Sequence, residues 1–254
     1  MIFMRILPGV LKELTKYVPS VLFQAVDWSE LGHEIPKLSR RMLKKEGLVD
    51  LLNAYRLQFL SHGIVPTDDP VVPTSVVNDE ISAKRILTFF FGQLFLTKGL
   101  FLDLRPNHFE NKNEKLYYHA SGFWTVLESD FRESLIKVYD GFYCDDDELY
   151  IQGLEGIGLI KKDWSQKEKD ALAAIFSKQF GDKKALTVKF HLEDLNKTIV
   201  DLSHFMLERR VKISKDFLYL GVYLVSLYAT LEESNVELPV REIYLDSKRS
   251  FSKA

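Results

Sequence analysis

Residues 99–122 of this 254-residue chain, GLFLDLRPNHFENKNEKLYYHASG, contain the side chains whose types and spacing could do chemistry. The stretch runs from apolar to polar residues around a proline and back to apolar ones, which predicts a helix end, a loop and two short strands around a turn. Asp103 could be a catalytic or cation-binding carboxylate, or could instead accept hydrogen bonds from backbone amides of its own loop. His108 and His119 could share a metal ion with Asp103, although isolated histidines more commonly serve only as hydrogen-bonding residues.

The elements that must position these residues are mostly helical, and the chain shows no internal repeat. A helix is expected from about residue 79 to 97, with Gly99 just past its end, and KLYYHA (115–120) is a strand candidate. The Ser165 and Glu168 pair forms a capping-box signature at the start of a later helix, which is expected to close on Gly181. Helical patterns follow the strand candidate over residues 129–143, 145–160, 165–181, 191–210 and 214–234.

The first part of the chain reads as a separate helical segment. Residues 29–61 have helical periodicity, and HGIVPTDDPVVPTS (62–75) then interrupts it with three prolines and a glycine, which predicts a linker. We therefore expect a mainly α protein with a helical N-terminal segment at 1–75 and a second helical domain at 76–254, which contains one short β-hairpin.

Composition places the chain among ordinary globular proteins. Apolar residues make up 46% and charged residues 28%, and a net charge of −2 gives no basic field that would indicate nucleic-acid binding. Cys144 is the only cysteine, so an internal disulfide and a cysteine zinc cluster are excluded, and a cytoplasmic location is expected. No window is long and apolar enough to predict a spanning helix, but residues 1–20 have an apolar helical face that could contact a membrane surface or pack on the protein itself.

The order of parts in residues 84–245 resembles the C-terminal lobe of the AarF/UbiB/ADCK family of atypical kinases. In that family a helix ends in a phrase like G-F-F-H-A-D-x-H-P-G-N, a turn and K-L-x-L-L-D-F-G follow, and another helix comes after a phrase like L-S-x-x-x-R. This chain has GLFLDLRPNH at 99–108, EKLYYHASG at 114–122 and VLESDFRESLIKVYDGF at 126–142. The resemblance implies a kinase-like helical C-lobe in which the predicted hairpin follows the catalytic loop.

Three motif residues of the family are kept in this chain. By the resemblance, Asp103 stands at the catalytic-loop Asp, Pro106 at the proline of the same motif, and Gly122 at the glycine of the second motif. The residues that shape the loop are therefore present.

Other motif residues differ, and two of these positions hold metal ligands in the family. Arg105 replaces a histidine, His108 stands at the metal-binding Asn, and Ala120 stands at the metal-binding Asp. Phosphoryl transfer depends on magnesium, which prefers hard oxygen ligands. Alanine offers no ligand atom and histidine offers nitrogen, so ordinary magnesium-ATP chemistry is not expected.

The small lobe of the family is not recognisable in this chain. Its Lys-x-Gly-Gln signature is missing, since FFGQ at 90–93 falls within a predicted helix, and the residues ahead of the C-lobe show little strand pattern. We therefore expect no ATP, magnesium or other cofactor.

Three hypotheses for function remain open. The first is a catalytically inactive pseudokinase that acts as a scaffold or as an accessory protein associated with quinone or isoprenoid lipid, with a protein or membrane lipid as its partner. The second is a divergent ATPase or kinase whose metal site is rebuilt from Asp103, His108 and His119. The third is a helical module that binds a hydrophobic ligand or a protein. Its pocket would be lined by Phe89, Phe90, Phe91, Phe95 and Tyr117, although a plain core explains these aromatic residues better.

Overall fold

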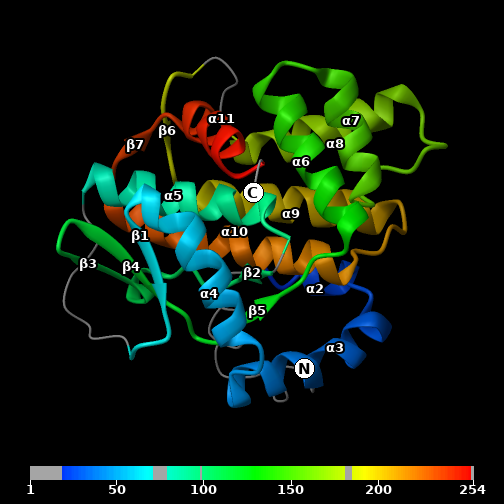
Figure 1. Ribbon diagram of the computed structural model, residues 1–254. Helices are drawn as coiled ribbons and strands as arrows, with labels where there is room; N and C mark the ends of the chain where they lie inside the picture. Colours follow the sequence, from blue (N-terminus) through cyan, green and yellow to red (C-terminus); the bar gives the residue numbers. More distant parts are fainter. Residues whose placement is uncertain (1–18, 71–78, 98, 181–184, 253–254) are drawn as a thin grey trace. The chain divides into compact units, whose positions relative to one another are not determined.

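The computed structural model describes residues 19–70, 79–97, 99–180 and 185–252 (Figure 1). The described chain is mainly helical with small sheets, which confirms the predicted fold class. Within these residues, no helix has the length and apolar character needed to cross a membrane. The apolar face predicted for residues 1–20 falls almost wholly outside the described part, as does Gly181.

The chain divides into two compact units, each made of several chain segments. The first comprises residues 1–34, 127–185 and 192–221, and the second comprises residues 35–126, 186–191 and 222–254. The boundary predicted at residue 75 lies outside the described residues and stays a prediction.

Helices make up the described part of the first unit. Gly141 and Gly153 allow two of them, α6 and α7, to approach closely, because a Cβ on Gly141 would lie 2.3 Å from the Tyr150 nitrogen and one on Gly153 would lie 2.6 Å from the Val138 nitrogen. The elements are α2 (Leu22–Ala25), the start of α3 (Trp28–Lys44), α6 (Ser129–Tyr143), α7 (Asp147–Gly156), α8 (Gln166–Ser177), η4 (Lys178–Phe180), α9 (Leu192–Glu208) and the start of α10 (Lys215–Ser234). The predicted capping box is confirmed at the start of α8, where Ser165 and Glu168 bond each other's backbone.

The second unit combines helices with three small sheets. Its helices beyond the ends of α3 and α10 are α4 (Leu48–Phe59), η2 (Leu60–His62), α5 (Glu80–Phe95), η3 (Pro106–His108) and α11 (Val240–Phe251). Its strands are β1 (Ile64–Thr67), β2 (Leu100–Phe101), β3 (Phe109–Lys112), β4 (Lys115–His119), β5 (Trp124–Thr125), β6 (Val188–Lys189) and β7 (Glu237–Leu238).

The largest sheet has the strand order β1-β4-β3, and these strands lie side by side in Figure 1. Strands β3 and β4 form the predicted hairpin, and its two-residue turn has positive φ at Asn113 (51°) and Glu114 (60°), as a type I′ turn requires. The sequence predicts an irregular linker over 62–75, whereas Ile64–Thr67 pair in parallel with β4. Pro66 can occupy β1 because this strand lies at the edge of the sheet, where a missing N–H costs no ladder bond.

Aromatic rings fill the core of the second unit between α4, α5 and the sheet. Phe89 contacts Phe59 at a centroid distance of 4.8 Å and Tyr118 at 4.8 Å, and Tyr118 lies 5.2 Å from Phe101. Phe90 and Phe91 are also buried, so three of the five aromatic residues that could have lined a ligand pocket pack as core, whereas Phe95 and Tyr117 are half-buried.

Candidate functional site around Asp103

Two paired strands close the base of the segment that contains the Asp103 loop. Strand β2 before the loop pairs antiparallel with β5 after the hairpin, and the Leu102 N–H donates to the Phe123 carbonyl at 3.0 Å. The helix α5 ends at Phe95, four residues before Gly99, so the expectation that Gly99 ends the helix is not met. A Cβ at Gly99 would lie 3.0 Å from the Trp124 ring, so close packing explains the glycine. The two halves of the 99–122 stretch are therefore joined at their base.

Helix α10 fixes the loop from the other side. The Ser226 hydroxyl donates to the Leu102 carbonyl at 2.9 Å and accepts from the Leu104 N–H at 3.1 Å. Thr230 adds a hydrogen bond from its hydroxyl to the Leu104 carbonyl. These bonds satisfy the backbone polar groups on both sides of Asp103 within the protein, as buried backbone groups require.

The carboxylate of Asp103 is completely buried and is held by Arg105. Arg105 Nε lies 2.8 Å from Oδ1 and Arg105 Nη2 lies 2.8 Å from Oδ2, which is a bidentate pair, and the Arg105 N–H adds a longer bond of 3.3 Å to Oδ1. Tyr118 donates its hydroxyl to the Asp103 carbonyl at 2.9 Å. Burial raises the pKa of Tyr118 well above its ordinary value, so the phenol remains a neutral donor.

His108 links Asp103 to the second motif. Its Nε2 lies 3.0 Å from Asp103 Oδ2, and its Nδ1 lies 2.7 Å from the carbonyl of His119, the residue before Ala120. A carbonyl and an ionised carboxylate both accept hydrogen bonds, so the ring lies between two acceptor groups. The imidazole thus joins the two motifs directly.

The surroundings of Asp103 favour its charged form. Burial alone would raise the pKa of this carboxyl, but the hydrogen bonds and charges of His108 and Arg105 outweigh burial and hold the pKa well below its ordinary value of 3.8. Asp103 is therefore a weak base, and both of its oxygens are already in use. The alternative role stated for it was a loop carboxylate that accepts hydrogen bonds from backbone amides. The Arg105 N–H makes such a bond, whereas the shorter contacts come from the side chains of Arg105 and His108.

The His119 ring contacts partners other than Asp103. Its Nδ1 lies 3.1 Å from the Asp69 carbonyl, and its Nε2 lies 3.2 Å from Glu110 Oε2. The structure thus brings Asp103 and His108 together, while the His119 ring bonds β3 and the residues after β1. Within the described ranges, no three His, Cys, Asp or Glu side chains gather in a group that could hold a metal ion.

The remaining motif residues shape the backbone. Pro106 is the first residue of η3, where its missing N–H and fixed φ are favourable. Gly122 has φ of 80°, a conformation that glycine adopts without steric cost. Ala120 is buried, and its N–H donates to the Thr67 carbonyl at 2.8 Å.

The sequence contains few signals that predict which groups bond to the Asp103 loop. Arg105 stands two residues after Asp103, a spacing that permits ion pairing, and this signal could have suggested the pair. Ser226 and Thr230 lie more than 120 residues away on α10, and only their spacing of four residues on one helix face links them.

Comparisons with known proteins do not assign the chain to a group. No family model matches the sequence, and no curated protein matches it.

Proposed function

We propose that this chain is a catalytically inactive protein built like the C-terminal lobe of the AarF/UbiB/ADCK kinases, which acts as a scaffold or as a lipid-associated accessory protein. The order of elements supports this proposal. A helix, α5, is followed by the Asp103 loop, the β3–β4 hairpin, Gly122 and another helix, α6, as the resemblance implies.

The observation that carries the proposal is the position of the His108 ring. In the family, the residues at positions 108 and 120 would hold metal beside the catalytic Asp. Here the His108 ring joins the Asp103 carboxylate directly to the backbone carbonyl next to Ala120, at 3.0 and 2.7 Å. Protein groups thus make contacts that metal and substrate would need, which favours a structural role for the loop.

The charge balance around Asp103 supports the same role. Arg105 is a guanidinium that cannot lose its proton in a protein, and it pairs with both carboxylate oxygens. A general base has to reach a proton of its substrate, and the Asp103 side chain is 0% exposed.

Calorimetric titration of the full chain with ATP and magnesium tests the absence of catalysis. We expect no saturable heat with the unmodified protein and none with Asp103→Asn. Magnesium-dependent ATP binding by the unmodified chain that disappears in Asp103→Asn would overturn the proposal, because Asp103 would then serve a nucleotide site.

The lipid-associated form of the proposal rests on the resemblance and needs its own test. Co-sedimentation with vesicles that contain an isoprenoid quinone would be compared for the full chain and for a chain without residues 1–20. Pelleting of the full chain supports a lipid-associated accessory protein. A chain that stays in the supernatant contradicts this form, and the protein's role as a scaffold then remains as the proposal.

A further inference from the structure

The outer face of α4 carries three large apolar side chains that the second unit does not cover. Val49, Leu57 and Leu60 are 58%, 82% and 50% exposed. On the opposite side of the same helix, Tyr55 and Phe59 are completely buried in the core. Single exposed aliphatic residues are common on protein surfaces, but a stripe of them along one helix face is typical of a surface that packs on another molecule.

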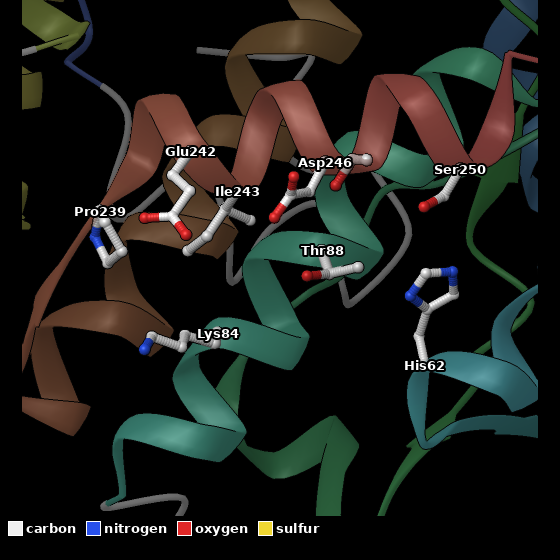
Figure 2. Close-up of a pocket in the computed structure, with 9 residues that line it drawn as sticks. His62, Lys84, Thr88, Pro239, Glu242, Ile243, Asp246 and Ser250 are labelled. Carbon is white, nitrogen blue, oxygen red and sulfur yellow. The ribbon is translucent and has the colours of Figure 1, made fainter.

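This face is separate from the groove between α5 and α11. The groove has a volume of about 250 Å³, and the His62 ring of η2 lies at one end of it (Figure 2). Among the described residues that line it, none belongs to α4. A molecule that covers the outer face of α4 therefore does not have to enter the groove.

The side chains on the outer face of α4 are arranged symmetrically about Asn53. Val49 and Leu57 stand four residues before and after Asn53. Asp50 and Arg56 stand three residues before and after it. Because successive residues of an α-helix are rotated by about 100°, all five project from the same side of the helix.

This symmetry matters when two copies of the helix pack antiparallel about a twofold axis at Asn53. Each residue then faces the residue that stands at the same distance on the other side of Asn53 in the second copy. Val49 faces Leu57 of the second copy, so apolar side chains meet. Asp50 faces Arg56 of the second copy, so opposite charges meet, and both contacts occur twice.

The charges favour this orientation over a parallel one. Asp50 is exposed and has no ion-pair partner in the described part of the chain. Arg56 donates from Nε to the Pro66 carbonyl at 3.0 Å, and its Nη2 lies 3.8 Å from Asp68, but its side chain is still 46% exposed. A guanidinium has five N–H donors, so donors remain for a second carboxylate. A parallel pair in register would instead place equal charges against each other.

Asn53 suits the position on the twofold axis. Its side chain is exposed and has no hydrogen-bond partner within the described residues. A side-chain amide both donates and accepts, so two Asn53 side chains can bond each other across the axis. A single Asn within an otherwise apolar helix seam also fixes the register of the pair.

We propose that α4 pairs with α4 of a second copy of this chain in an antiparallel dimer with twofold symmetry. The same patch then serves both copies, as in an isologous interface. A helix of 12 residues is about 18 Å long and about 10 Å wide, well below the roughly 800 Å² per partner of a standard interface. The dimer is therefore weak, with a Kd on the order of 10–100 µM. It does not depend on the inactivity proposed for the Asp103 loop.

Sedimentation velocity of the full chain between about 5 and 500 µM tests the dimer. We expect a monomer–dimer equilibrium in this range. Leu57→Gln should raise the Kd by about tenfold or more, because the variant removes two apolar contacts per dimer, while glutamine keeps a helix propensity close to that of leucine. Leu186→Gln is the matched control, since Leu186 is 90% exposed and lies outside α4, and it should leave the Kd unchanged.

A charge exchange tests the antiparallel register. Asp50→Lys and Arg56→Glu should each weaken the dimer by about tenfold or more, because each variant places equal charges against each other. A mixture of the two variants should restore association, since every contact across the axis is then between opposite charges. Asp130→Lys is the control, because Asp130 is exposed and lies in the first turn of α6 as Asp50 does in α4.

Far-UV circular dichroism checks that each variant is folded, since Arg56→Glu also removes the bond to the Pro66 carbonyl. If Arg56→Glu does not fold, Asp50→Lys and Leu57→Gln still decide. A chain that stays monomeric at about 500 µM would overturn the proposal, and the face would then be open to a different partner. A dimer that Leu57→Gln and Asp50→Lys leave unchanged, or folded charge variants that do not associate when mixed, would overturn it as well.

Discussion

Arg105 holds the carboxylate of Asp103 through two parallel hydrogen bonds of 2.8 Å each, and the two side chains are 15% and 0% exposed. Bidentate pairs of this kind fix orientation as well as charge. The pair lies between the strand that leads into the loop and the hairpin that leaves it. The change in the free energy of unfolding when this pair is broken therefore distinguishes a structural cluster from an active site.

Replacing one member of the pair should destabilise the protein strongly. Asp103→Asn leaves the half-buried Arg105 and the buried His108 without their shared carboxylate. We expect a loss of about 3–5 kcal/mol in the free energy of unfolding, as when a buried ion pair is broken. Urea denaturation measures it, and the double variant with Arg105→Met should cost clearly less than the sum of the two single changes. Additive effects, or a stabilised Asp103→Asn as catalytic residues often give, would contradict a structural pair.

His108→Asn restores the residue type of the kinase motif but removes a bridge. An Asn amide is too short to bond both the Asp103 carboxylate and the His119 carbonyl, which lie on opposite nitrogens of the imidazole. We expect a loss of about 1–3 kcal/mol from the unsatisfied buried group and no gain of magnesium-ATP binding. His204→Asn, an exposed histidine on α9, is the control and should change stability little. A gain of nucleotide binding by His108→Asn would indicate a latent active site.

The sequence predicts the helical content and the hairpin because their signals are local. The capping box at Ser165 and the alternation in KLYYHA each depend on a few neighbouring residues. Strand β1 was missed because its pairing partner lies some 50 residues later and Pro66 argues against a strand. Helix α11 was missed although Val240, Ile243 and Tyr244 begin an apolar helical repeat.

The candidate site was predicted only as a set of positions. Motif spacing located Asp103 and His108, but it could not indicate that the His108 ring would join the Asp103 carboxylate to the carbonyl of His119. That contact depends on the β3–β4 register, which places residues 108 and 119 at the same end of the hairpin. Hydrogen bonds from α10 depend on the packing of the whole second unit and have no local signature.

Acid should lower the free energy of unfolding, in part because Asp103 becomes protonated. The folded pKa of this carboxyl is held below its ordinary 3.8, so its contribution to stability is complete above about pH 4 and is lost as the pH falls toward the depressed folded value. We expect the difference in unfolding free energy between the unmodified chain and Asp103→Asn to shrink between about pH 4 and pH 2. Urea titrations at several pH values measure it. A difference that stays constant over this range would mean that Asp103 is not ionised through these contacts.

Gly92 tests the packing of α11 on α5, the two helices that border the groove. A Cβ at Gly92 would lie 2.6 Å from Cε1 of Phe59 and 2.8 Å from Cε2 of Phe251, and both rings are buried. Gly92→Ala must displace these rings, so we expect a net loss of about 1–3 kcal/mol despite the better helix propensity of alanine. Gly32→Ala on α3 is the control, because no atom lies within 4 Å of its Cβ and the change should stabilise by about 0.5–1 kcal/mol. If Gly92→Ala were as stable as Gly32→Ala, Phe251 and α11 would not pack against α5 in solution, and the groove between them would lose its wall.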